Sequence, residues 1–279
     1  MNTTELLKAC INWFAKEDNV RAVVLIGSRA QKEKTDRLAG FDLDLFVQDP
    51  DSLVEETGWL EVLEKPLLTH LDYEEDLVIW RGIFENGLLV ALFIQPLTTL
   101  SAIQEQLPPY YLPKYKVLID KDGQTAQFPK PVKDTSAPDM PTPEAFQACL
   151  TRFWLEVFFT MKCLWRKELW RAKHYDWRVK GELLQMMGWH AVVCEGRNGF
   201  TTLEGDQINT WVSANTYAAL QGTFGHFNLA DSWRALDETI LLFTRLSKAI
   251  AAEMDYEYPE EQELKFKFLI DELSANPPN

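Results

Sequence analysis

The sequence predicts an α+β fold in two domains, with a mixed sheet in the first part and a bundle of helices in the second. Before residue 127, short strand-like runs alternate with helical segments but show no regular strand–helix–strand repeat. Residues 128–143 contain five prolines and little that could form a core, which predicts a linker. After this segment, apolar residues recur at helical spacing. The expected domains are therefore 1–127 and 144–279.

The first domain is expected to begin with a helix at 4–17, capped by Thr3 or Thr4. Asn86-Gly87 between two apolar runs is a strong hairpin signal, because both residues tolerate a positive φ. The expected helices are 4–17, 51–64 and 98–106, and the expected strands are 22–26, 41–47, 77–84, 88–94 and 116–119. The expected helices of the second domain are 145–169, 178–193, 205–220, 231–254 and 259–273, with Asp231 as the N-cap of the fourth.

Charge and composition limit the partners. The formal net charge of -14 argues against a nucleic-acid backbone as the main partner and is compatible with a cationic small molecule, although many soluble proteins are simply acidic. The four cysteines show neither zinc-site spacing nor a disulfide framework. No segment has the pattern of a signal peptide or reaches the ~20 apolar residues of a membrane span. A cytoplasmic protein that binds no membrane is expected.

Two aspartates stand out in the strand 41–47. Asp42 and Asp44 fall on one face of the strand, and neighbouring like charges repel each other unless a cation is shared between them. The preceding strand ends in Gly27-Ser28-Arg29, where a tight turn and the start of a helix could hold phosphate groups. Asp42 and Asp44 could then bind Mg²⁺ together with a phosphate. The alternative is a surface hairpin with a solvated acidic edge.

Three cations in the second domain have helical spacing. Lys162, Arg166 and Lys173 are spaced i, i+4 and i+11, which is expected to put them on roughly one stripe of the buried helix, and such a stripe at a cleft could neutralise a triphosphate. A solvated face of the helix explains the same spacing equally well.

Together, these segments resemble the aminoglycoside 6-adenylyltransferase (streptomycin adenylyltransferase) family of the DNA polymerase beta-like nucleotidyltransferase superfamily. The resemblance rests on Gly27-Ser28 followed by Asp42-Leu43-Asp44 and extends through 94–97, 115–123 and 153–173. It implies a nucleotidyltransferase domain that binds ATP with Mg²⁺ and a helical domain that closes the aminoglycoside site. AMP would be transferred to a hydroxyl of an aminoglycoside such as streptomycin.

The resemblance also implies roles for individual residues. Asp42 and Asp44 would be the catalytic metal ligands, and Gly27, Ser28 and Arg29 would hold the leaving phosphates. Lys162, Arg166 and Lys173 would face the nucleotide.

One position departs from the family pattern. The family has a third carboxylate on the later strand, and this position is Ala91 here. Alanine can neither complete a metal site nor accept a proton, and a general base is typically worth about 10²–10⁴ in rate. The sequence therefore predicts adenylyl transfer that is weak or has an altered acceptor. The alternatives are a catalytically inactive homologue that binds a nucleotide or another ligand, and a purely structural two-domain protein.

Overall fold

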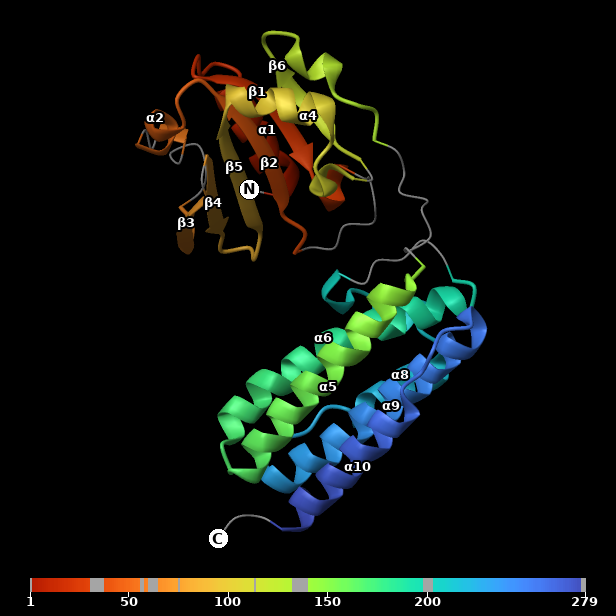
Figure 1. Cartoon of the computed structure of the whole chain (residues 1–279). Helices are drawn as coiled ribbons and strands as arrows, with labels where there is room; N and C mark the ends of the chain where they lie inside the picture. Colours follow the sequence, from red (N-terminus) through yellow and green to blue (C-terminus); the bar gives the residue numbers. More distant parts are fainter. Residues whose placement is uncertain are drawn as a thin grey trace. The chain divides into compact units, whose positions relative to one another are not determined.

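The computed structural model describes residues 2–30, 38–55, 58–59, 65–74, 76–112, 114–131, 140–197 and 203–276. They form two compact units, Met1–Asp134 and Thr135–Asn279 (Figure 1). The boundary lies inside the segment 128–143, in which the sequence predicts a linker. Phe128, at the start of that segment, is buried in the core of the first unit, so this core includes a residue past the predicted domain end at residue 127.

A sheet of six strands forms the centre of the described part of the first unit, in the order β3-β4-β5-β2-β1-β6. Strands β2 and β5 are parallel, and the other neighbouring pairs are antiparallel. The strands are β1 (Val20–Ile26), β2 (Phe41–Val47), β3 (Leu68–Glu74), β4 (Leu77–Ile83), β5 (Leu89–Pro96) and β6 (Lys116–Asp120), and the α-helices are α1 (Thr3–Phe14), α2 (Pro50–Glu55) and α4 (Leu100–Glu105). The mixed sheet confirms the predicted α+β fold.

The sheet has an apolar core on each face because the side chains of its central strands alternate. On one face, Leu43 and Leu45 of β2 belong to a core that includes Leu6, Cys10 and Phe14 of α1. The other face carries Asp42 and Asp44. Its core is formed by Ala22, Val24, Ile26, Phe46, Leu100, Ile103, Tyr111 and Phe128. The two aspartates thus share their face of the sheet with an apolar core.

The hairpin between β4 and β5 forms as predicted. Gly87 has a φ of +82°, and the side-chain oxygen of Asn86 accepts a hydrogen bond of 3.0 Å from the backbone N–H of Leu88. The turn sets the register of the two strands, in which Arg81 of β4 pairs with Ala91 of β5. This register determines which side chains of β4 line up with the aspartates across β5.

Several boundaries differ from the prediction. The edge strand β3 is not predicted by the sequence, because most of its side chains are exposed and it lacks a clear apolar face. Asn2, rather than Thr3 or Thr4, caps α1 and forms a capping box with Glu5. Of the predicted helix 51–64, α2 ends at Glu55, and residues 56–57 and 60–64 lie outside the described part of the chain.

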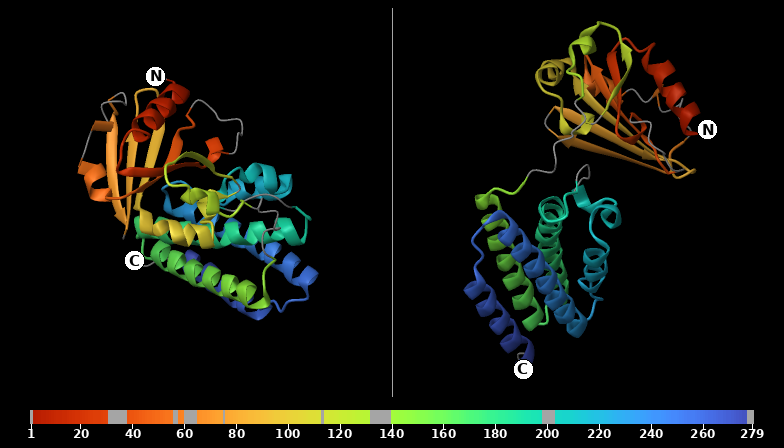
Figure 2. Two further views of the ribbon diagram at one scale, coloured as in Figure 1. Left: turned by 90° about the horizontal axis from the view of Figure 1, so that it is seen from above. Right: turned by 90° about the vertical axis from the view of Figure 1, so that its right-hand side faces the viewer.

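The described part of the second unit is helical throughout, as predicted. Its helices are α5 (Pro143–Trp165), α6 (Leu169–Val193), α7 (Ile208–Trp211), α8 (Ala214–Gly222), α9 (Leu229–Met254) and α10 (Glu260–Ala275). Helices α5 and α6 pack side by side, and α9 lies against both (Figure 2). Their core includes Phe153 of α5, which stacks on Phe243 of α9 with ring centroids 3.5 Å apart. None of the helices in the described residues is long and apolar enough to cross a membrane.

The prediction of one helix over 145–169 is wrong at its C-terminal end. Helix α5 ends at Trp165, and Lys167 has a φ of +60°, in the left-handed region that breaks a helix. Helix α6 begins at Leu169, well before the predicted start at Arg178. Lys162 and Lys173 therefore lie on different helices, and the predicted stripe of three cations on one helix does not form.

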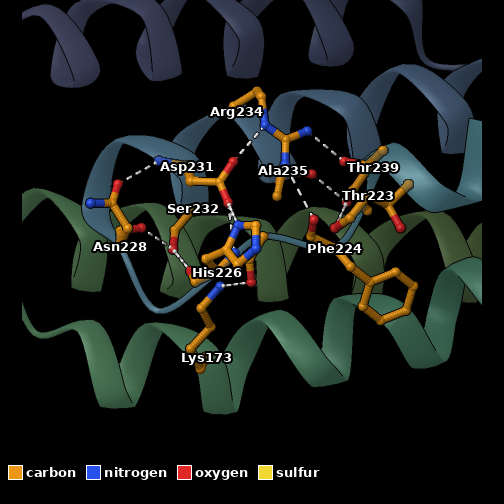
Figure 3. A network of polar contacts seen from close by, with 12 residues as sticks. Lys173, Thr223, Phe224, His226, Asn228, Asp231, Ser232, Arg234, Ala235 and Thr239 are labelled. Atoms are coloured by element: carbon orange, nitrogen blue, oxygen red, sulfur yellow. Dashed lines mark hydrogen bonds and ion pairs between the residues drawn. The ribbon is translucent and has the colours of Figure 1, made fainter.

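A network of hydrogen bonds ties the loop between α8 and α9 to α9 (Figure 3). Oδ2 of Asp231 accepts from the backbone N–H of His226 at 2.6 Å, and its Oδ1 accepts from Nε of Arg234 at 2.7 Å. Arg234 also donates to the carbonyl of Gly222 at 2.8 Å. The hydrogen bonds from His226 and Arg234 hold the pKa of Asp231 well below its ordinary value. The N-cap of α9 is Asn228, not the predicted Asp231.

Candidate active site

The turn after β1 lies directly against Asp42. Gly27 has a φ of +71°, and a Cβ at this position would lie only 2.6 Å from Oδ2 of Asp42. Ile26, which precedes the turn, is the register partner of Asp42 in the antiparallel pair β1–β2. Glycine is thus required here both for the backbone conformation and for the close approach of the carboxylate. The geometry brings Gly27 and Asp42 together, and their roles toward phosphate and metal stay predictions.

The predicted helix after this turn is described only at its start. Ser28–Ala30 form a single 3-10 turn, and residues 31–37 lie outside the described part of the chain. Nε of Arg29 donates to the carbonyl of Gly40 at 2.6 Å, and its Nη2 donates to the carbonyl of Ala39 at 2.7 Å. Arg29 therefore holds the segment before β2 in place through hydrogen bonds to its backbone. A phosphate contact by Arg29 remains a prediction.

Asp44 is completely buried, and both of its carboxylate oxygens have donors. The hydroxyl of Tyr111 donates to Oδ2 at 2.7 Å, and the amide of Gln95 donates to Oδ1. Burial raises the pKa of Asp44 from 3.8 to about 6, while the hydrogen bonds from Tyr111 and Gln95 act in the opposite direction. Asp44 is thus enclosed by the protein.

Asp42 is in a different environment, although it lies only two residues away. Its side chain is partly exposed, and no described residue donates a hydrogen bond to its carboxylate. Burial raises the pKa of Asp42, and the positive charge of Arg81 acts to lower it. Of the two aspartates, Asp42 is the one that a ligand can reach.

Ala91, the position at which the resemblance implies a third carboxylate, adjoins Asp42. Ala91 is the register partner of Asp42 in the parallel pair β2–β5, and its side chain is buried. Within the described residues, no group of three or more His, Cys, Asp or Glu side chains could hold a metal ion. Since Asp44 has no exposed surface and donors on both oxygens, and Ala91 offers no ligand, these residues do not fit the predicted shared Mg²⁺ in this arrangement.

The predicted cations belong to the helical unit. Lys173 of α6 donates from Nζ to the carbonyl of Gly225 at 2.8 Å, and so helps to hold the loop between α8 and α9 (Figure 3). Lys162 lies in the last turn of α5, and Arg166 is the C-cap of this helix. Their contact with a nucleotide remains a prediction.

The sequence prediction missed three residues of this site, Tyr111, Gln95 and Arg81. Arg81 could have been found from the hairpin, because the turn at Asn86-Gly87 sets it opposite Ala91. Gln95 and Tyr111 give no such signal. Tyr111 lies in a short segment after two prolines, and nothing in that segment indicates that its hydroxyl reaches Asp44.

Comparison with known proteins identifies the family. The family model described as streptomycin adenylyltransferase matches residues 1–271. The aminoglycoside 6-adenylyltransferase of Campylobacter jejuni is 27% identical over 253 residues, covering 88% of this chain and 87% of that protein. The protein of the same name from Bacillus subtilis (strain 168) is 25% identical over 274 residues, covering 93% of each chain.

A solved structure is also similar. The crystal structure of an aminoglycoside 6-adenyltransferase from Bacillus subtilis aligns over 99% of this chain and 100% of that chain, with 22% identity and a TM-score of 0.47. The family model alone spans nearly the whole sequence, including both units. The chain therefore belongs to the streptomycin adenylyltransferase family.

Proposed function

We propose that this protein binds ATP at the turn Gly27-Ser28 and transfers AMP, at a low rate, to a hydroxyl of a cationic, aminoglycoside-like small molecule such as streptomycin. The observation that supports the proposal is the close approach of Gly27 to the Asp42 carboxylate, because the turn at Gly27-Ser28 then lies beside a partly exposed acid in a member of this family. The acidic composition, with a net charge of -14, favours a cationic acceptor. The reaction is proposed to take place in the cytoplasm.

In the proposed reaction, the acceptor oxygen attacks the α-phosphorus of ATP and forms the new P–O bond. The bond between this phosphorus and the bridging oxygen breaks, and pyrophosphate leaves with the electron pair. Asp42 accepts the proton of the hydroxyl, since it is the accessible carboxylate and its raised pKa makes it a stronger base than an ordinary aspartate. The backbone N–H groups of Gly27 and Ser28 bind the departing phosphates.

The rate of AMP transfer is expected to be low because the candidate site has fewer accessible carboxylates than the family pattern implies. Ala91 takes the place of one carboxylate, and Tyr111 and Gln95 enclose Asp44. Such transfers depend mainly on positioning and on charge around the phosphates, so a loss of ligands lowers the turnover number more than it lowers nucleotide binding.

A second candidate is a nucleotide-binding protein without turnover. The enclosed carboxylate of Asp44 favours this second candidate. A carboxylate that binds a catalytic metal ion needs accessible oxygens, and Asp44 has no exposed surface. Both candidates share the nucleotide site at Gly27-Ser28, and they differ only in whether AMP is transferred.

Two measurements on the full-length protein test these functions. ATP, with and without Mg²⁺, is expected to raise the melting temperature by mass action. Pyrophosphate release is then followed with ATP and streptomycin, for the wild-type protein and for Asp42→Asn. The exposed Asp51 of α2 provides a matched control as Asp51→Asn.

The outcomes separate the candidates. Release that needs streptomycin, is lost in Asp42→Asn and persists in Asp51→Asn supports the transferase. A thermal shift without release in any variant supports the binding protein. If millimolar ATP leaves the melting temperature unchanged in both conditions, neither function is correct.

A further inference from the structure

Arg81, Ala91 and Asp42 form a row across three neighbouring strands. Ala91 of β5 is the register partner of Asp42 of β2 and also of Arg81 of β4. Register partners point to the same face of a sheet, and neighbouring strands lie about 4.8 Å apart. The backbones of Arg81 and Asp42 are therefore about 10 Å apart, with only the methyl group of Ala91 between them. An arginine side chain can extend over much of this distance.

Alanine at position 91 makes this face of the sheet less negative than a carboxylate at the same position would. A carboxylate at position 91 would stand between Asp42 and Arg81 and would add a negative charge, whereas alanine adds none. The charge of Arg81 already acts on Asp42, because it lowers the pKa of Asp42 against the effect of burial. Asp44 contributes no open oxygen, since Tyr111 and Gln95 bind both of its oxygens. The charged groups on this face thus include the guanidinium of Arg81, the carboxylate of Asp42 and, on β3, the carboxylate of Asp72, which pairs with Arg81.

Arg81 is also held in position from its other side. Its Nη1 forms an ion pair with Asp72 of β3, and Asp72 is bonded in turn to Nε2 of His70 at 2.9 Å. The Arg81 side chain remains 37% exposed. Within the described residues, no acceptor other than Asp72 contacts its guanidinium. One edge of the guanidinium is thus fixed by protein, and its remaining N–H groups are available for a ligand.

We propose that Arg81 takes the place of a divalent cation in this protein, binding the polyphosphate of a nucleoside triphosphate beside Gly27-Ser28 so that the nucleotide binds without metal. A guanidinium is suited to this role because it stays charged and can donate two parallel hydrogen bonds to phosphate oxygens. Alanine at position 91 places no carboxylate between Arg81 and Asp42 that would compete for the guanidinium. The proposal rests on the nucleotide-binding part of the proposed function and does not depend on AMP transfer.

The test is the dissociation constant of ATP for the full-length protein, measured by calorimetry in EDTA and in excess Mg²⁺. The wild-type protein is expected to bind ATP in EDTA within about threefold of its affinity in Mg²⁺. Arg81→Gln is expected to weaken ATP binding in EDTA by about tenfold or more, because it removes a charge-assisted contact. Arg81→Lys is expected to recover part of the lost affinity. Ala91→Asp is expected to weaken binding in EDTA and to make it depend on Mg²⁺.

Arg21→Gln is the matched control. Arg21 of β1 also lies on a strand of this sheet and pairs with a carboxylate, that of Asp122, so its loss removes an equivalent ion pair remote from position 91. It should leave the affinity for ATP unchanged. Binding by the wild-type protein only in the presence of Mg²⁺, or equal binding in EDTA by Arg81→Gln and the wild type, would overturn the role of Arg81 while leaving nucleotide binding intact. An absence of ATP binding in both conditions would overturn the proposed function as well.

Discussion

The hydroxyl of Tyr111 donates a hydrogen bond of 2.7 Å to Oδ2 of Asp44, at the centre of the face of the sheet that carries the candidate site. Tyr111 is itself fully buried, with Tyr115 and Phe128 against its ring. The contact therefore joins one of the two aspartates to the apolar core of the first unit. Asp42 and Asp44 look equivalent in the sequence, yet they have different roles in the fold.

The bond between Tyr111 and Asp44 should contribute measurably to stability. Tyr111→Phe removes a donor from a buried carboxylate, and we expect a loss of about 1.5–3 kcal/mol in the free energy of unfolding at neutral pH. The matched control is Tyr115→Phe, because the hydroxyl of Tyr115 donates only to the neutral carbonyl of Pro129, at 3.1 Å. Urea denaturation of both variants gives the comparison. Equal losses for the two substitutions would contradict the role assigned to Tyr111.

The stability of the protein should fall as pH rises through the range in which Asp44 titrates. Burial raises the pKa of Asp44 from 3.8 to about 6, so the folded state holds this proton more tightly than the unfolded chain does. Between about pH 4 and about pH 6 the folded state binds more protons, and ionisation then costs the folded state on the order of 3 kcal/mol.

Asp44→Asn isolates this effect. The asparagine carbonyl can accept from Gln95, and its amide can donate to the Tyr111 hydroxyl, so the hydrogen bonds remain while the charge is removed. Urea denaturation at a series of pH values should show the wild-type protein losing stability relative to Asp44→Asn as pH rises. Parallel curves for the two proteins would show that Asp44 does not titrate in this way.

Gly27 should be needed for both backbone conformation and the site. In Gly27→Ala the new Cβ would meet Oδ2 of Asp42 at 2.6 Å, in addition to the strain of a φ of +71°. Gly123→Ala is a matched control, since Gly123 has a φ of +69° and nothing within 4 Å of the added Cβ. The control should cost about 1–2 kcal/mol in stability and leave ATP binding unchanged.

Gly27→Ala should cost more than this control, and it should also weaken ATP binding in calorimetry. If the two alanine variants lose the same stability and bind ATP equally well, Gly27 has no special relation to Asp42.

Asp231 should hold the loop between α8 and α9. Its pKa is lowered by the backbone N–H of His226 and by Arg234, so the stabilisation is present at neutral pH and is lost as pH falls below the ordinary range of aspartate. In Asp231→Asn, hydrogen exchange of the loop amides around His226 should become faster at neutral pH. Asp237→Asn, on the same helix, is the control, because burial and nearby acids raise the pKa of Asp237. It should leave loop exchange unchanged, and faster exchange in both variants would contradict the network.

Much of the fold follows from local patterns in the sequence. Strand β2 was predicted at its observed bounds, because its apolar residues alternate with the aspartates and side chains point to opposite faces of a strand. The hairpin at Asn86-Gly87 was predicted for a similar reason, since Gly87 takes the positive φ that such turns need. In both cases the information lies within a few neighbouring residues.

The remaining features depend on contacts between distant residues. Lys167 ends α5 with a positive φ although no glycine marks the position. The enclosure of Asp44 requires Tyr111, 67 positions away, to pack over the sheet. A pattern in sequence cannot show such a contact, and the spacing of Asp42 and Asp44 alone does not distinguish their surroundings.

A crystal structure of the full-length protein grown with ATP and Mg²⁺ tests the central claim most directly. We predict that the Arg81 guanidinium lies about 3 Å from a phosphate oxygen, a hydrogen-bonding distance, while Tyr111 remains bonded to Asp44. A metal ion bound between Asp42 and Asp44, with the Tyr111 hydroxyl displaced and Arg81 away from the phosphates, would contradict this account.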